Sequence, residues 1–206
     1  MSRFPILLGL LFLTVSMHAI DFRIGIMAGA NSSLNQLYTY SDIKNTDPKL
    51  GYNGNLFGRF TFNNYFIQPE AGYLMNRIGY SISENGSIQE ANFNLGQMYT
   101  SILMGVKISK LRFSAGPMIS FTSNQSFEAL TSQNSVIQQI NDGRANLGVM
   151  MDLGLDISKR WCIDLKASRT FTQSEFNAVV QNKSFNFSGN TGIISIMIGY
   201  TIFKAP

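Results

Sequence analysis

The sequence predicts an all-β protein: an eight-stranded antiparallel up-and-down transmembrane β-barrel with short periplasmic turns and long extracellular loops. Three observations predict this fold class. Eight segments alternate between apolar and polar residues, as strands with one apolar face do. The connections between these segments alternate between long and short. Nearly all charged residues inside the segments fall on one of the two faces.

The first 19 residues have the composition of a secretory signal peptide. Arg3 precedes an apolar run from Phe4 to Val15, and the segment ends on the small residue Ala19. The apolar run is shorter than the roughly 20 residues that a membrane-spanning helix needs. We therefore expect residues 1–19 to be cleaved during export and residues 20–206 to form one outer-membrane β-barrel domain.

Each predicted strand is a run in which one parity of residues is apolar and the other is mixed. The clearest case is the hairpin from Gly51 to Tyr80, in which two such runs meet at the polar pair Asn63 and Asn64. Glycines recur inside the runs, which indicates bends or close packing. The other predicted strands, in chain order, are residues 22–30, 95–108, 111–122, 144–157, 161–171 and 190–203.

The connections divide into two classes by length. The short ones are residues 63–64, 109–110 and 158–160, and the long polar ones are residues 31–50, 83–94, 123–143 and 172–189. A soluble barrel has no physical reason to segregate its connections in this way. A transmembrane barrel has one, because its periplasmic turns are short and its extracellular loops are long.

The charged residues decide which face of the sheet is inside. A mid-strand Arg or Lys that faced lipid would cost about 2–4 kcal/mol. An eight-stranded barrel is just wide enough for side chains to fill it, and charges buried there must be paired. We therefore predict that ion pairs fill the lumen and leave no open pore. We also expect Arg59 and Glu70 to pair with each other across the hairpin. The predicted inward charges are Arg23, Arg59, Glu70, Lys107, Arg112, Asp152, Asp156, Asp164 and Lys166.

Two arginines and several aromatic residues are expected at the membrane boundaries. Arg77 and Arg169 have the lipid-facing parity but lie toward the long-loop ends of their strands, from which long side chains reach the headgroups. Tyr65 and Trp161 lie beside short turns, as in the aromatic belts of transmembrane barrels.

The chain offers little for catalysis or metal binding. Its only histidine, His18, falls in the predicted signal peptide, so the exported chain lacks a Ser-His-Asp or Cys-His mechanism. The single cysteine, Cys162, forms no internal disulfide. No acidic cluster has the spacing of a calcium loop. We therefore predict no catalytic residues, no metal and no cofactor, and the modest net charge of +4 argues against nucleic acid as a partner.

Four motifs, in order along the chain, resemble the PorT-like outer-membrane β-barrel family of Bacteroidota. They are RIGIMAGANSS (Arg23 to Ser33), YFIQPEAGYLMNRIGY (Tyr65 to Tyr80), FSAGP (Phe113 to Pro117) and DLGL (Asp152 to Leu155). The resemblance covers essentially the whole chain after residue 19. It implies a location in the bacterial outer membrane and this barrel, and it implies no particular activity.

The function expected from these features is non-enzymatic. The barrel would act structurally, as an anchor for its surface loops, or as a subunit of a larger outer-membrane complex such as secretion or assembly machinery. Its expected partners are outer-membrane lipid and other outer-membrane or periplasmic proteins. Two alternatives remain open at this point: a soluble lipocalin-like binding barrel, which would need the charged face outside, and a narrow transport channel.

Overall fold

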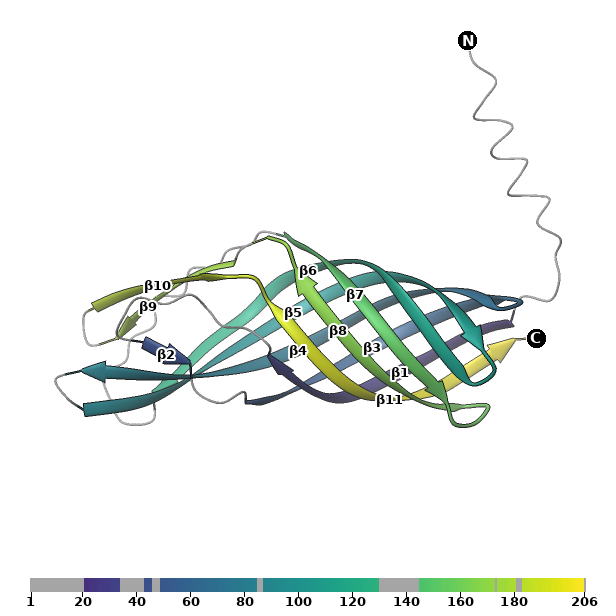
Figure 1. The fold of residues 1–206 in the computed structure, drawn as a ribbon, viewed down its shortest axis with the longest axis horizontal. Helices are drawn as coiled ribbons and strands as arrows, with labels where there is room; N and C mark the ends of the chain where they lie inside the picture. The colour runs from purple at the N-terminus through teal and green to yellow at the C-terminus, as the bar shows by residue number, and fades with distance from the viewer. Residues whose placement is uncertain are drawn as a thin grey trace, which may run out of the picture.

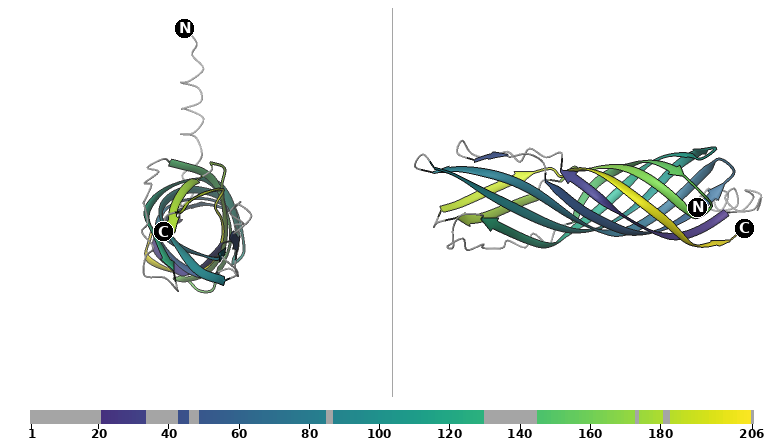
Figure 2. Two further views of the ribbon diagram at one scale, coloured as in Figure 1. Left: turned by 90° about the vertical axis from the view of Figure 1, so that its left-hand side faces the viewer. Right: turned by 90° about the horizontal axis from the view of Figure 1, so that it is seen from below.

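The computed structural model describes residues 21–33, 43–45, 49–84, 87–129, 145–172, 174–180 and 183–205. Its body is a closed antiparallel β-barrel of eight strands (Figures 1 and 2), which confirms the predicted fold class. Residues 1–19, the predicted signal peptide, lie outside the described part. Among the described residues, no helix is long and apolar enough to cross a membrane. The barrel strands are β1 (Asp21–Ser33), β3 (Leu50–Phe62), β4 (Tyr65–Glu84), β5 (Ser87–Ile108), β6 (Leu111–Ala129), β7 (Ala145–Asp156), β8 (Trp161–Thr170) and β11 (Gly192–Ala205).

The strands close into a ring with a fixed stagger. The order around the ring is β4-β3-β1-β11-β8-β7-β6-β5, and β5 pairs with β4 again. One row of paired residues starts at Phe22 and returns to β1 at Ser32, ten residues further on, so the shear number is 10. With a strand spacing of about 4.8 Å and a rise of about 3.3 Å per residue, such a barrel has strands tilted by about 40° and a backbone radius of about 8 Å. That radius leaves room for side chains inside.

The short turns gather at one end of the barrel, which we call the turn end. They join β3 to β4, β5 to β6 and β7 to β8, and the first residues of β1 pair there with the last residues of β11. Asn63 and Ser109 have positive φ angles of 55° and 57°. Tight hairpin turns need such a left-handed residue, and asparagine tolerates it better than most residues do. The opposite end, where the strands extend furthest, is the loop end (Figure 1).

At the loop end the structure corrects the predicted connections. The stretch 83–94 is largely strand, because β4 runs to Glu84 and β5 starts at Ser87. Likewise β6 continues to Ala129, a short strand β2 (Ile43–Asn45) pairs with β4, and β9 (Ser174–Val180) and β10 (Lys183–Gly189) form a separate hairpin. Beyond the lipid both faces of a strand meet water, so the apolar alternation that marks a strand in the sequence is lost there.

The outer surface of the strands is apolar, and this excludes the lipocalin-like alternative. Leucine, isoleucine, methionine and phenylalanine side chains are exposed on all eight barrel strands, among them Ile26, Leu56, Met104 and Ile196. The charged parity is buried inside. A soluble barrel would have the reverse arrangement. Arg77 and Arg169 are exposed on this outer surface, on the parity expected from the sequence.

The inward side chains change in character from the turn end to the loop end. Charged residues lie inside the turn end and extend toward the middle of the barrel. Two clusters of buried, mostly apolar residues lie among and beyond these charges, and they contain Leu74, Tyr99, Leu103, Met118, Met150 and Ile193 in one and Met27, Phe57, Cys162 and Met197 in the other. Nearer the loop end, the inward positions are buried neutral amides, including Asn31, Asn76, Gln97 and Asn146.

Candidate functional site: the charged lumen

The nine charged residues predicted to face inward all do so, from seven strands. Arg23 lies on β1, Arg59 on β3, Glu70 on β4 and Lys107 on β5. Arg112 lies on β6, Asp152 and Asp156 on β7, and Asp164 and Lys166 on β8. All are buried except Lys107, whose side chain is 25% exposed. The strand period of two is the reason, because residues of one parity on a tilted strand share one face.

Asp156 is the centre of the ion pairs at the turn end. Its carboxylate lies 2.7 Å from Nζ of Lys107 and 2.9 Å from Nε of Arg112. Nη1 of Arg59 lies 3.5 Å away and Nη1 of Arg23 lies 3.7 Å away. One buried carboxylate therefore faces cations from four other strands, and it holds the turn end of the lumen together.

A second acid at this end, Asp21, was not among the predicted lumen charges. Its carboxylate accepts a hydrogen bond of 2.8 Å from Nη2 of Arg23 and lies 3.4 Å from Nζ of Lys204. Asp21 has the same parity as Arg23, but the predicted first strand began one residue later. Extending that strand by one residue would have found it.

Arg112 also reaches Asp164, and a glycine makes room for it. Nη2 of Arg112 donates to Oδ1 of Asp164 over 2.6 Å, and both side chains are fully buried. A Cβ atom on Gly154 would lie 2.5 Å from Cζ of Arg112, so a side chain there would displace the guanidinium. Arg59 lies between two rings, with its Cζ 5.2 Å from the centroid of Phe57 and 5.7 Å from that of Phe66, a cation–π arrangement.

Glu70 belongs to a separate network nearer the middle of the barrel. Its Oε2 accepts from Nζ of Lys166 over 2.6 Å and from Nδ2 of Asn55 over 2.9 Å. Asn55 also donates to the hydroxyl of Tyr99 over 3.0 Å. Every contact here is buried, so the Glu70 carboxylate has the charged and polar partners that a buried anion requires.

The expected direct pair of Arg59 and Glu70 is wrong in detail. Gln68 lies between the two: its Oε1 accepts from Nε of Arg59, and its Nε2 donates to Oε1 of Glu70. The ion-pair partner of Arg59 is Asp156, and that of Glu70 is Lys166. Gln68 shares the inward parity of Glu70. Because Gln68 is uncharged, the pattern of charges in the sequence does not reveal that it links Arg59 to Glu70.

Asp152 differs from the other lumen acids. It is 4% exposed, and neither carboxylate oxygen has a hydrogen-bond partner among the described residues. Its neighbours across the sheet are Ser114 on β6, whose hydroxyl is also unpaired within the described part, and Lys166 on β8. Lys166 directs its ammonium group to Glu70 instead.

Two of the ion pairs cross the full width of the lumen. In the ring of eight strands, β4 lies opposite β8 and β3 lies opposite β7. The Glu70–Lys166 and Arg59–Asp156 pairs therefore join opposite walls. These bridges place charged side chains in the interior of the barrel.

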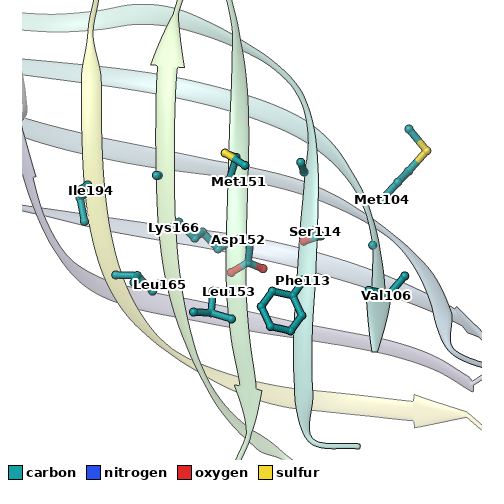
Figure 3. Close-up of a pocket in the computed structure, with 13 residues that line it drawn as sticks. Met104, Val106, Phe113, Ser114, Met151, Asp152, Leu153, Leu165, Lys166 and Ile194 are labelled. Carbon is teal, nitrogen blue, oxygen red and sulfur yellow. The ribbon is translucent and has the colours of Figure 1, made fainter. Parts of the chain in front are cut away.

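A shallow groove of about 520 Å³ lies on the outer wall. Its labelled side chains come from five neighbouring strands, β5, β6, β7, β8 and β11 (Figure 3). Ala115 and Ala167 flank Met151 in register, and their small side chains create the depression between larger ones. The lumen residues Ser114, Asp152 and Lys166 also border the groove, but its accessible surface is mostly apolar, as on the rest of the outer wall.

The described residues hold no group of three or more His, Cys, Asp or Glu side chains placed to bind a metal ion. Cys162 is buried and unpaired, and it packs with Met27, Phe57 and Met197. Its surroundings are those of a packed core cysteine.

The apolar outer wall, the closed eight-stranded ring and the charged lumen define an integral β-barrel of the outer-membrane class. A family model described as "Outer membrane protein beta-barrel domain" matches residues 14–175, and the chain belongs to this family. Membership supports a location in the outer membrane and implies a lipid environment for the outer wall. None of the curated proteins compared with the chain matches it in sequence.

Several solved structures of outer-membrane barrels are similar to the chain. Neisserial surface protein A is 12% identical with a TM-score of 0.46, over 87% of this chain and 97% of that one. OprG from Pseudomonas aeruginosa is 9% identical with a TM-score of 0.47, over 89% and 95%. Outer membrane protein W from Escherichia coli is 14% identical with a TM-score of 0.42, over 90% and 100%.

Proposed function

We propose that this protein is a non-enzymatic outer-membrane barrel with a side-chain-filled lumen, which anchors the segments at its loop end or serves as a subunit of a larger outer-membrane complex. In this proposal the turn end faces the periplasm and the loop end faces the cell exterior. The chain reaches the membrane after cleavage of residues 1–19. Within the family, the four sequence motifs favour the PorT-like group of Bacteroidota.

The observation that carries the proposal is the pair of ion bridges between opposite walls. Glu70–Lys166 and Arg59–Asp156 each tie together strands that face one another across the lumen. A transport channel needs a continuous aqueous path, and larger barrels obtain it by having more strands. Here the interior is occupied by paired charges and packed methionine and aromatic side chains. Such a barrel is suited to holding an attached surface in place.

Conductance in planar bilayers tests the filled lumen. We expect the refolded protein to give no single-channel steps, while a large porin in the same bilayers conducts. Heat-modifiable migration on gels checks that the protein inserted as a folded barrel. Discrete, reproducible conductance from protein that shows the gel shift would favour the narrow transport channel instead.

Membership of a complex needs a separate experiment. The intact protein would be purified from its native membrane in mild detergent and its mass measured by native electrophoresis. A stable larger assembly with other outer-membrane or periplasmic proteins supports the role as a subunit. Recovery as the monomer alone, with surface loops accessible on intact cells, supports the anchoring role.

A further inference from the structure

Basic side chains other than the nine lumen charges gather at the turn end. Lys110 lies in the turn between β5 and β6, Lys159 and Arg160 lie in the turn between β7 and β8, and Lys204 lies near the end of β11. All four are exposed. Among the described residues at this end, the one carboxylate that reaches the surface is Asp21, which is 28% exposed and engaged with Arg23 and Lys204. The surface charge here is therefore positive.

Backbone contacts place these residues side by side. The amide of Asp156 donates to the carbonyl of Lys110 over 2.8 Å, which joins the first turn to the start of the second. The amide of Thr201 donates to the carbonyl of Arg160 over 2.8 Å, which joins the second turn to β11. Lys110, Lys159, Arg160 and Lys204 thus lie on successive turns and strands along one part of the rim, and we call them the basic arc.

Local hydrogen bonds and an aromatic contact shape the turn between β7 and β8. The hydroxyl of Ser158 accepts hydrogen bonds from the amides of Arg160 and Trp161, at 3.3 and 3.1 Å. Nη1 of Arg160 donates to the hydroxyl of Tyr200 over 2.9 Å. The rings of Trp161 and Tyr200 lie 4.8 Å apart between centroids. The guanidinium therefore lies beside an aromatic pair.

The aromatic rings indicate the depth of the arc in the membrane. Trp161 is 50% exposed on the outer wall, and Tyr65 is exposed beside the turn between β3 and β4. Tryptophan and tyrosine concentrate at the headgroup level because one end of each ring system is apolar and the other is polar. A cation held against such rings lies at the level of the lipid phosphates.

We propose that the basic arc binds the headgroup phosphates of anionic phospholipids in the leaflet at the turn end. Charge complementarity supports this occupant, since several adjacent cations without a free carboxylate attract an anionic membrane surface. Arginine and lysine both bind phosphate through charge-assisted hydrogen bonds. The inference rests on the membrane-spanning barrel of the proposed function, and on its turn end facing the leaflet built of phospholipid.

The test measures lipid binding to the refolded mature barrel in detergent micelles. Native mass spectrometry would count the bound molecules during titration with phosphatidylglycerol or phosphatidylcholine. For the unaltered protein we expect preferential retention of phosphatidylglycerol. The variant Lys110→Gln/Lys159→Gln/Arg160→Gln should bind it about tenfold more weakly, and added salt should weaken binding to the unaltered protein. Inorganic phosphate at the same concentration should not displace the lipid.

The matched control is Arg77→Gln/Arg169→Gln, which removes two exposed arginines of the outer wall nearer the loop end. It should retain the phosphatidylglycerol preference.

All variants are compared only after they show the heat-modifiable gel shift, which checks that they are folded. If the triple variant does not fold, the single charge reversal Lys159→Glu in an exposed turn replaces it. Equal retention by the arc variant and the unaltered protein, or equal loss in the control, would overturn the proposal. Displacement by inorganic phosphate would reveal a free-phosphate site instead. Conductance is measured independently, so failure of the lumen proposal is distinguishable from failure of this one.

Discussion

Asp156 holds more cations than any other acid of the described lumen. Lys107, Arg112, Arg59 and Arg23 all lie within ion-pair distance of its carboxylate. Removing one partner of a buried ion pair leaves an uncompensated charge and costs about 3–5 kcal/mol. We expect Asp156→Asn to lower the free energy of unfolding by at least about 3 kcal/mol. Urea unfolding in lipid vesicles, followed by the gel shift, measures the change.

Asp152→Asn provides the comparison within the same strand. This carboxylate is equally buried but has no hydrogen-bond partner among the described residues. An unpaired buried charge is costly, so a neutral amide of the same shape should leave stability unchanged or raise it by about 1 kcal/mol. If Asp152→Asn destabilised the barrel as much as Asp156→Asn, the distinction between a paired and an unpaired lumen acid would be wrong.

At the residue scale, the sequence predicts which side chains face inward but not which of them meet. Parity alone places Arg59, Glu70 and Lys166 in the lumen. Their partners depend on the shear number, which brings Glu70 of β4 opposite Lys166 of β8, 96 residues away. The alternation of residues carries no information about this stagger. A neighbour on the same hairpin, such as Arg59 for Glu70, is therefore the natural but mistaken choice.

At the element scale, β5 and β6 approach closely beside Gly116. A Cβ atom there would overlap the carbonyl oxygen of Ile102, and a backbone atom in a closed sheet has little room to move. We expect Gly116→Ala to lower the free energy of unfolding by about 2–3 kcal/mol, a typical cost of overpacking. Urea unfolding of the refolded variant in vesicles measures this cost.

Gly54→Ala in β3 is the matched control. Its nearest neighbour would be the carbonyl oxygen of Met27 at 3.6 Å, an ordinary contact. Because alanine has less conformational entropy to lose than glycine, this variant should equal or exceed the stability of the unaltered protein by up to about 1 kcal/mol. Equal effects of the two substitutions would mean that strand glycines in this barrel act through backbone entropy and not through close approach.

The strands were predictable where they cross the lipid and not beyond it. Residues of β7 alternate cleanly, and its observed bounds differ from the predicted ones by a single residue at each end. The outer parts of β4, β5 and β6 have polar residues on both faces, so their sequences are typical of loops. Backbone hydrogen bonds between long strands keep these parts paired without an apolar face.

At the scale of the whole molecule, eight strands with a shear number of 10 leave a narrow interior that must be filled. Charged side chains lie inside the turn end and reach the middle, where methionine, leucine and aromatic side chains are also buried. The cross-lumen pairs therefore act on the entire ring, because each ties opposite walls and not merely neighbouring strands. Loss of such a bridge should affect the stability of the whole barrel.

Exchanging the charges of one bridge tests this view. In Glu70→Lys, the new ammonium would face Lys166 in a buried site, and we expect a loss of about 3–5 kcal/mol or failure to fold. The double variant Glu70→Lys/Lys166→Glu restores opposite charges and should recover part of that loss. Recovery should be incomplete because Asn55 and Gln68 donate hydrogen bonds to position 70, which suits a carboxylate and not an ammonium group.

The gel shift and urea midpoints of both variants measure the coupling between opposite walls. A double variant no more stable than Glu70→Lys would show that the two side chains act independently and that the bridge does not hold the lumen closed.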